Sequence, residues 1–397
     1  MRIPSLFTAV LFLSALTPAW AGVHPATDDA PHTAAQGSTW DKAAAAKYLD
    51  DRQTWWQEWP HAQKDHGTVC VSCHTQVPYA LARPALRAPL GEKAISDPER
   101  AMLDSIEKRV ELGKEAETFY SDAHNGAGKT QEARNAEAVN NALILASYDA
   151  QRAKADAASG IVYRTIPQLH RDSRAAFAAM WALQEQNGPK AGAWIWQNFR
   201  FSPWEAPESE YWGATMAAIA TGTAPEHYVD DPAIQHNLTL LRDYLHREAA
   251  TQPLINRIHL LWASARLSGL MSKDERAALV KELYAKQRPD GGWCLTDLGL
   301  DKQGASAWKR RDKTPFPAAS DGYATGLIVL ALEENHLDKK AEAKRGLAWL
   351  AANQSKTDGR WQAWSVNVDR KPESDVGKFM SDAATGFSVL ALEESRH

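Results

Sequence analysis

A Gly–Trp pattern that occurs three times constrains this chain more than any other feature. It appears as GAW at 192–194, as GGW at 291–293 and as GRW at 359–361. An amphipathic helical stretch precedes each copy, and an apolar stretch rich in small residues follows each one. A recurrence of this kind predicts stacked supersecondary units rather than an irregular helical domain.

The last copy resembles the Gln-Trp repeat of the squalene and hopene cyclase family. That repeat has a basic and a small residue, then an aromatic–aliphatic pair, a Gln and a final Gly-x-Trp. The resemblance is clear over the C-terminal third, weaker upstream, and implies an α/α toroid with alternating outer and inner helices around a central cavity. With one extra residue before the glycine, the matching positions are Arg345, Gly346, Trp349, Leu350, Gln354, Gly359 and Trp361.

Helical periodicity, counted without that resemblance, predicts the same architecture. Charged amphipathic segments alternate with segments rich in Ala, Gly and Leu, which suits outer and buried inner helices respectively. Twelve segments make six outer–inner pairs, so we expect an all-α, (α/α)6 toroid; a helical bundle or open helical array is the alternative. The expected helices cover residues 41–57, 74–87, 97–117, 131–152, 172–186, 208–222, 236–249, 254–269, 273–286, 320–334, 338–353 and 380–395.

The start of the chain is typical of a secretory signal. Arg2 precedes an apolar run over 6–16, and Ala19-Trp20-Ala21 is a small-x-small cleavage site. The run is too short to cross a bilayer, so we expect cleavage after Ala21 and export to the periplasm or another exported compartment. The expected organisation is a signal peptide at 1–21, a disordered lead-in at 22–39 and a single toroid domain at 40–397.

Charge and cysteine content exclude several classes of protein. The formal net charge is −4 with interspersed signs, which argues against nucleic acid as a partner. No segment after the signal is long and apolar enough to span a membrane. Three cysteines are too few for a disulfide framework, and Cys294, outside the motif described next, is expected to be a buried, unpaired thiol.

Cys70-Val-Ser-Cys73-His74 has the spacing of covalent haem attachment. Two thiols at this spacing add to the haem vinyl groups while the adjacent imidazole ligates the iron. We therefore expect one haem c per chain, held by Cys70, Cys73 and His74. A redox disulfide and a zinc site are the alternatives, but the sequence lacks a thioredoxin-like βαβ context and a second cysteine pair.

The haem motif is expected inside the first repeat. Residues 63–67 match the Gln-x-x-x-Gly part of the repeat, Val69 takes the tryptophan position, and Cys70 follows at once. His74 would then open the first inner helix. The haem should therefore face the cavity at the rim where the inner helices begin.

A closed ring would bring two further loops close to that haem. One contains Tyr120 and His124, and the other contains Lys378 and Met380. His124 and Met380 are the candidate sixth ligands of the iron, and His66 is a nearer option. An open or water-bound position is the alternative.

Acidic and aromatic residues are expected at the same rim. Glu210, Asp321 and Asp382 each fall in the first turn of an inner helix, and Tyr323 follows Asp321 closely. These four are candidate catalytic residues; the simpler alternative is that the carboxylates cap helices and meet their positive ends. The Asp-x-Asp-Asp motif that starts carbocation chemistry in the cyclase family is absent, so the resemblance does not extend to catalysis.

Together these features predict an exported c-type haem protein that acts as an oxidoreductase or in electron transfer. In that hypothesis a partner such as another cytochrome exchanges electrons with the iron, while aromatic walls hold an apolar or polycyclic substrate. A non-enzymatic electron carrier or haem-based sensor is the first alternative. A terpenoid-acting cyclase, lyase or isomerase with a structural haem is the second.

Overall fold

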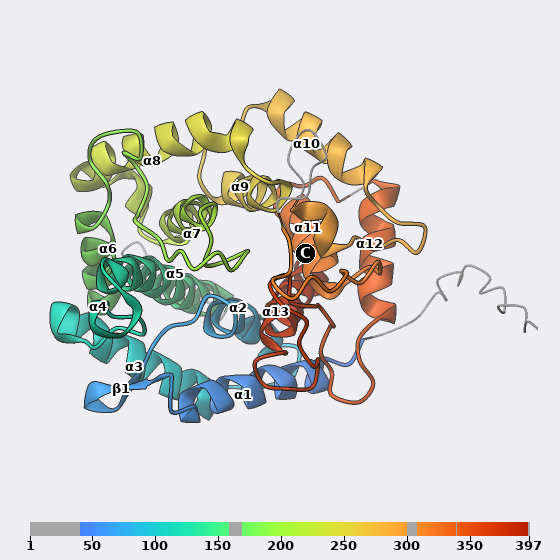
Figure 1. The fold of residues 1–397 in the computed structure, drawn as a ribbon, viewed down its shortest axis with the longest axis horizontal. Helices are drawn as coiled ribbons and strands as arrows, with labels where there is room; N and C mark the ends of the chain where they lie inside the picture. The colour runs from blue at the N-terminus through green and yellow to red at the C-terminus, as the bar shows by residue number, and fades with distance from the viewer. Residues whose placement is uncertain (1–39, 159–168, 300–307, 339, 396–397) are drawn as a thin grey trace, which may run out of the picture. The chain divides into compact units, whose positions relative to one another are not determined.

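Two concentric sets of helices make up the part of the chain that the computed structural model describes, residues 40–158, 169–299, 308–338 and 340–395 (Figure 1). The outer helices are α1 (Lys42–Glu58), α3 (Asp97–Leu112), α6 (Arg171–Ala182), α8 (Gln235–Glu248), α10 (Lys273–Ala285) and α12 (Ala341–Ala352). The inner helices are α2 (Gln76–Ala82), α5 (Lys129–Ala158), α7 (Ser209–Thr223), α9 (Leu254–Arg266), α11 (Gly322–Glu334) and α13 (Phe379–Glu394).

The expected all-α toroid is confirmed at the level of architecture, because each predicted helix has a counterpart in the ring. Among the predicted helices that end early, two stop for clear local reasons. The helix expected over 97–117 stops at Leu112, where Gly113 takes a positive φ of 56°. The helix expected over 74–87 becomes α2 followed by a 3-10 turn at Arg83–Leu86, because Pro84 cannot donate a backbone hydrogen bond.

Besides several 3-10 turns, the described part of the chain contains three small elements. The strands β1 (Gln63–Lys64) and β2 (Thr68–Val69) pair antiparallel just before the Cys70–His74 segment. The short helix α4 (Asp122–Asn125) precedes α5. Residues 1–39 lie outside the described residues, and with them the predicted signal peptide, its cleavage after Ala21 and the lead-in. No described helix combines the length and apolar character that a membrane span requires.

The inner helices close into a ring. Each packs against the next in chain order, and α13 returns to pack against α2. At this closure a Cβ on Gly386 of α13 would lie only 2.6 Å from Cβ of Pro78 in α2. Glycine is therefore needed for the first and last inner helices to approach so closely.

The glutamine of each Gly–Trp repeat joins one outer helix to the next. Gln354, after α12, donates to the carbonyl of Asp41 at 2.8 Å and accepts from its N–H at 2.6 Å, which links the last outer helix to the start of α1. Gln184 and Gln287 likewise donate to the carbonyls of Asn237 in α8 and Glu342 in α12. The repeated residue is therefore a staple between neighbouring repeats.

The tryptophan of each repeat fixes its loop against the preceding outer helix. All three indoles are at most 1% exposed. Each indole N–H donates to a carbonyl near the end of that helix, 2.7–2.8 Å away. The pairs are Trp194 with Met180, Trp293 with Leu283, and Trp361 with Leu350.

We expect Trp361→Ala to lower the free energy of unfolding by about 3–5 kcal/mol, because it removes a fully buried ring and its hydrogen bond to Leu350. Denaturant unfolding followed by circular dichroism measures the loss. Trp364→Ala is the control, since Trp364 is only partly buried, and it should cost clearly less. Equal losses in the two variants would contradict the structural role of the repeat tryptophan.

Candidate functional site

A pocket opens beside the first turns of inner helices α2 and α13, and the Cys70–His74 segment forms one wall of it. It contains about 1240 Å³ of atom-free space, part of which is open to solvent. Other walls come from α1, α5, α13 and the loops that carry Tyr120 and Trp204. Segments from both ends of the chain therefore meet here. Aromatic residues in these walls are Trp56, Trp59, Phe119, Tyr120, Phe201, Trp204 and Phe379.

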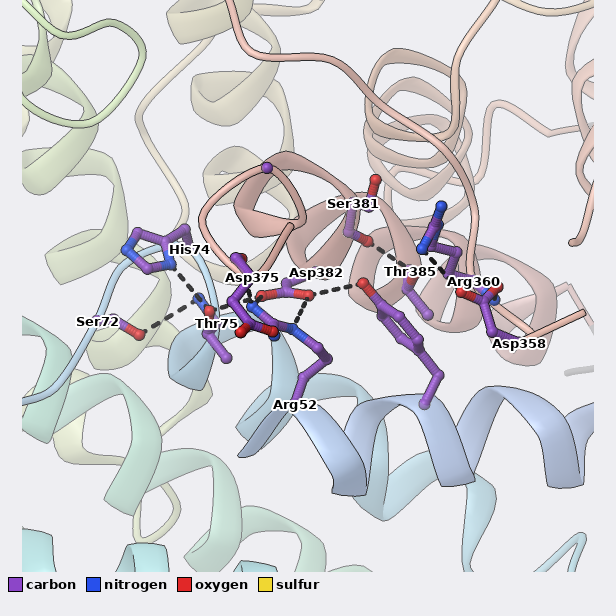
Figure 2. A network of polar contacts seen from close by, with 12 residues as sticks. Arg52, Ser72, His74, Thr75, Asp358, Arg360, Asp375, Ser381, Asp382 and Thr385 are labelled. Carbon is purple, nitrogen blue, oxygen red and sulfur yellow. Dashed lines mark hydrogen bonds and ion pairs between the residues drawn. The ribbon is translucent and has the colours of Figure 1, made fainter. Parts of the chain in front are cut away.

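His74 is held in one tautomer by a hydrogen-bond relay (Figure 2). Its Nδ1 lies 2.9 Å from the Thr75 hydroxyl, and that hydroxyl donates to Oδ2 of Asp382 at 2.8 Å. Because the Thr75 proton points to the carboxylate, the hydroxyl can only accept from His74. Nδ1 therefore carries the proton, and Nε2 keeps a free lone pair.

The ring of His74 is neutral and fixed in its plane. Burial, assisted by the nearby Arg52 guanidinium, lowers the pKa of His74 to about 3. The imidazole stacks on Phe379 with ring centroids 3.8 Å apart and meets Trp56 edge to face at 5.2 Å. A neutral imidazole held in this way is suited to metal ligation.

Asp382 anchors the relay in a buried ion pair. Its Oδ1 accepts from Nε of Arg52 and from the hydroxyl of Tyr48, both at 2.8 Å, and Oδ2 accepts from a second Arg52 nitrogen at 3.0 Å. Arg52 is also bonded to Asp375 (Figure 2). The Asp382 carboxylate is thus fully engaged, and it positions His74 through Thr75 instead of facing the pocket.

Both cysteines of the motif are free, buried thiols. Burial raises the pKa of Cys70 and of Cys73 to about 12, so both stay protonated at neutral pH. Asn140 of α5 donates to Sγ of Cys73 at 3.4 Å, while its Oδ1 is buried without a partner among the described residues. The indole of Trp56 donates to the carbonyl of Cys70 at 2.8 Å. The segment is rigidly placed, and its thiols are not joined as a disulfide.

Glu205 is a pocket residue that the sequence did not reveal. Burial raises its pKa to about 7, although a hydrogen bond from the Tyr120 hydroxyl at 2.9 Å and the charge of Lys129 oppose the shift. The residue lies in an irregular loop with no helical period and no motif. Only the fold brings this carboxyl to the pocket that Cys73 also lines and, by burying it, leaves it partly protonated at neutral pH.

The four candidate catalytic residues do not line this pocket. Asp321 caps α11 by accepting from the N–H of Ala324, and Glu210 pairs with Lys190 at 2.7 Å. Tyr323 is fully buried and packs against the pocket residue Trp204, at a centroid distance of 6.0 Å. Of the three carboxylates, Asp321 caps its helix, whereas Glu210 and Asp382 form ion pairs with Lys190 and Arg52.

The structure separates the candidate sixth ligands. Met380 is buried and lines the pocket. His124 lies exposed on α4 and is absent from the described residues that line it, and His66 is exposed in a left-handed conformation with φ of 54°. A zinc site at the motif also lacks support, because the described residues gather three ligand atoms within 4.8 Å only at Glu107, His170 and Asp172.

No protein-family model and no curated protein matches the chain. Solved structures match with 10–11% identity over 89% of this chain. They include the GH76A α-1,6-mannanase of Salegentibacter sp. HEL1_6 (TM-score 0.47, all of that chain covered) and the unsaturated glucuronyl hydrolase of Bacillus sp. GL1 (TM-score 0.46, 94% covered). A glycosidase in complex with glucose matches with a TM-score of 0.44 and 97% coverage.

These comparisons correct the function expected from the sequence. We expected an exported haem oxidoreductase, electron carrier or sensor, or a terpenoid-acting enzyme, whereas the similar structures carry the names of glycoside hydrolases. The predicted cytochrome, oxidoreductase and electron-transfer functions are therefore withdrawn. These comparisons do not test the expected haem c, because that expectation rests on Cys70, Cys73 and His74 themselves.

We expect Asp382→Asn to lower the free energy of unfolding by about 3–5 kcal/mol, because it leaves the buried Arg52 guanidinium with only the half-exposed Asp375 as a charge partner. Glu210→Gln is the matched control. Its partner Lys190 is largely exposed, so the loss should stay within about 1 kcal/mol. Denaturant unfolding of both variants makes the comparison, and a small loss for Asp382→Asn would contradict its role as an anchor.

Glu205 should also make stability depend on pH. Its folded pKa of about 7 lies above the ordinary value of 4.5, so its contribution is fully present below pH 4.5 and is lost as the pH rises through 7. Relative to Glu205→Gln, the wild type should lose up to about 3 kcal/mol of unfolding free energy between pH 5 and 8. Unfolding curves across that range measure the difference. A substitution of the exposed Glu117 by Gln is the control, and parallel curves for Glu205→Gln and the wild type would contradict the raised pKa.

Proposed function

We propose that this pocket covalently binds one haem c through Cys70 and Cys73, with His74 as the proximal ligand of the iron. The observation that carries the proposal is the state of His74. Its Nδ1 is committed to the Thr75–Asp382 relay, and its Nε2 makes no hydrogen bond with any described residue. Ligating histidines are oriented in this way, by a partner that holds the other ring nitrogen.

The thiols support the same assignment. Cys70 and Cys73 line the same pocket as His74, unpaired and protonated. Thioether formation consumes a thiol at each vinyl group, so two free thiols within three residues of one another are what the attachment requires. The alternatives of a redox disulfide and a zinc site draw no comparable support from the described residues.

The pocket walls also suit a large planar group with carboxylate substituents. Aromatic side chains supply flat apolar surface on several sides. Arg370 lines the pocket and forms no ion pair with the described residues, so it is available to a propionate. The unpartnered Oδ1 of Asn140 is a further polar group that a ligand could satisfy.

In this proposal the chain's own residues orient and shield the iron. Thr75 and Asp382 set the direction of Nε2, Phe379 fixes the imidazole plane, and Met380, which lines the same pocket, would be the candidate for a second protein ligand. When bound, the haem would supply an iron centre that His74 ligates. Export, which the N-terminal signal predicts, belongs to the same proposal because c-type haem is attached outside the cytoplasm.

A second candidate is glycan binding in the same pocket, and Glu205 favours it. A carboxyl that keeps its proton near neutral pH can act as a general acid. Trp59, Phe119 and Trp204 offer aromatic faces on which sugar rings could stack. A porphyrin attached at Cys70 and Cys73 would fill this space, so the two uses exclude each other.

Covalent haem can be tested directly. Protein exported from a host that matures c-type cytochromes should keep haem staining after denaturing electrophoresis, with an iron-to-protein ratio near one. Cys70→Ala combined with Cys73→Ala should abolish the stain, whereas Cys294→Ala should leave it unchanged because Cys294 lies outside the pocket. A colourless wild type that binds manno-oligosaccharides, with binding lost in Glu205→Gln, would reject haem and support the glycan candidate.

A further inference from the structure

A second group of ligand-type side chains lies on the outer layer of the ring, between α3 and α6. Glu107 comes from α3, and His170 and Asp172 stand at the start of α6. One ligand atom of each lies within 4.8 Å of the other two, and no other three such residues in the described part of the chain come together in this way. The cluster shares no lining residue with the haem pocket.

Two of the three ligand atoms already have the spacing of a metal site. Nδ1 of His170 lies 3.2 Å from Oδ2 of Asp172. Ligand atoms around a tetrahedral ion with bonds of about 2.0 Å lie about 3.3 Å apart. The other carboxylate oxygen, Oδ1, accepts from Nε of Arg171 at 2.8 Å, which orients the carboxylate and leaves Oδ2 toward His170.

The backbone holds His170 in place independently of its ring. Its N–H donates to Oδ2 of Asp149 at 2.8 Å, and the same carboxylate oxygen accepts from the Ser173 hydroxyl at 2.7 Å. The imidazole itself is about half exposed, and the Asp172 side chain is 7% exposed. The site therefore combines a buried carboxylate with a histidine that solvent can reach.

Glu107 is the member of the group without another explanation. It forms no hydrogen bond or ion pair with the described residues. One of its carboxylate oxygens lies within 4.8 Å of the ligand atoms of both His170 and Asp172. A divalent cation at this point would be shared by the two carboxylates and the imidazole.

A cavity next to the cluster leaves room for the remaining coordination positions. It contains about 1050 Å³ of atom-free space, partly open to solvent, and both Glu107 and His170 line it. Three protein ligands and an open fourth side are the arrangement of zinc sites that keep a water ligand. One imidazole nitrogen and two carboxylate oxygens also suit first-row divalent metals better than Ca²⁺ or Mg²⁺.

We propose that Glu107, His170 and Asp172 bind a first-row divalent transition metal such as Zn²⁺, which ties outer helix α3 to outer helix α6. The proposal does not depend on what occupies the haem pocket. Such a site would cross-link two neighbouring repeats at a point where no glutamine of the Gly–Trp repeat joins them.

The test uses the full-length exported protein, stripped with a chelator and titrated calorimetrically with Zn²⁺ alone. Wild type should bind one ion, and its thermal unfolding midpoint should rise with Zn²⁺ concentration. Glu107→Gln and His170→Ala should each weaken Zn²⁺ binding by at least about tenfold. Glu115→Gln is the control, because Glu115 is an exposed acid in the 3-10 turn that follows α3, and it should bind as the wild type does.

Glu107→Gln keeps the size of the side chain and breaks no described contact, so loss of binding in this variant would not reflect misfolding. Unchanged affinity in both Glu107→Gln and His170→Ala would overturn the proposal, as would the absence of binding in the wild type. Haem staining of each variant reports separately on the other pocket, so failure of one proposal is distinguishable from failure of the other.

Discussion

The buried ion pair between Arg52 and Asp382 is the contact on which the pocket depends, because it joins the first and last repeats. Arg52 belongs to α1 and Asp382 to α13, and the pair lies where α13 returns to pack against α2. The same closure brings Phe379 and Met380 from the end of the chain to the Cys70–His74 segment from its beginning. Without a closed ring, the part of the wall that α13 and the loop before it supply would be missing.

A buried ion pair does not stabilise a fold by default, since both charges lose their hydration. Here the cost is offset by complete hydrogen bonding: the Asp382 carboxylate accepts from Tyr48, from two nitrogens of Arg52 and from Thr75. The Thr75 bond extends the ion pair to His74. The interaction that closes the ring is therefore also the one that sets the tautomer and direction of the proposed iron ligand.

The sequence predicted the helices well because their signals are local. Amphipathic spacing and the Gly–Trp repeat marked all twelve helices of the ring, and the errors lie at helix ends, such as those at Gly113 and Pro84 and the ends of α5 and α6. Cys70, Cys73 and His74 could also be identified as a group, because five consecutive residues define the motif. Asp382 was recognised as an acid in the first turn of an inner helix, but its partners could not be, because Arg52 is 330 residues away.

Glu205 was missed for a different reason. Its unusual property, a proton retained near neutral pH, comes from burial by elements distant in sequence and not from its neighbours. The oxidoreductase function expected from the sequence was wrong for a related reason. A cofactor motif specifies a ligand chemistry, whereas the reaction depends on what the rest of the cavity wall does with it.

The first repeat departs from the others in a way that makes room for the motif. In the later repeats a loop tryptophan donates to the outer helix, as Trp361 does to Leu350. In the first repeat Val69 takes that position, and the indole comes from the outer helix instead: Trp56 of α1 donates to the carbonyl of Cys70. The contact between helix and loop is kept, but its donor and acceptor are exchanged.

The glutamine staple is replaced as well. Gln63 is exposed and donates only to the carbonyl of Gln57, so it does not join α1 to α3. Ser105 of α3 makes the connection instead: its hydroxyl accepts from the N–H of Val69 and donates to the carbonyl of Val69. Neither a glutamine staple nor a tryptophan occupies this loop, and residues 70–74 line the pocket instead. In the first repeat the loop thus presents two thiols and an imidazole to the cavity.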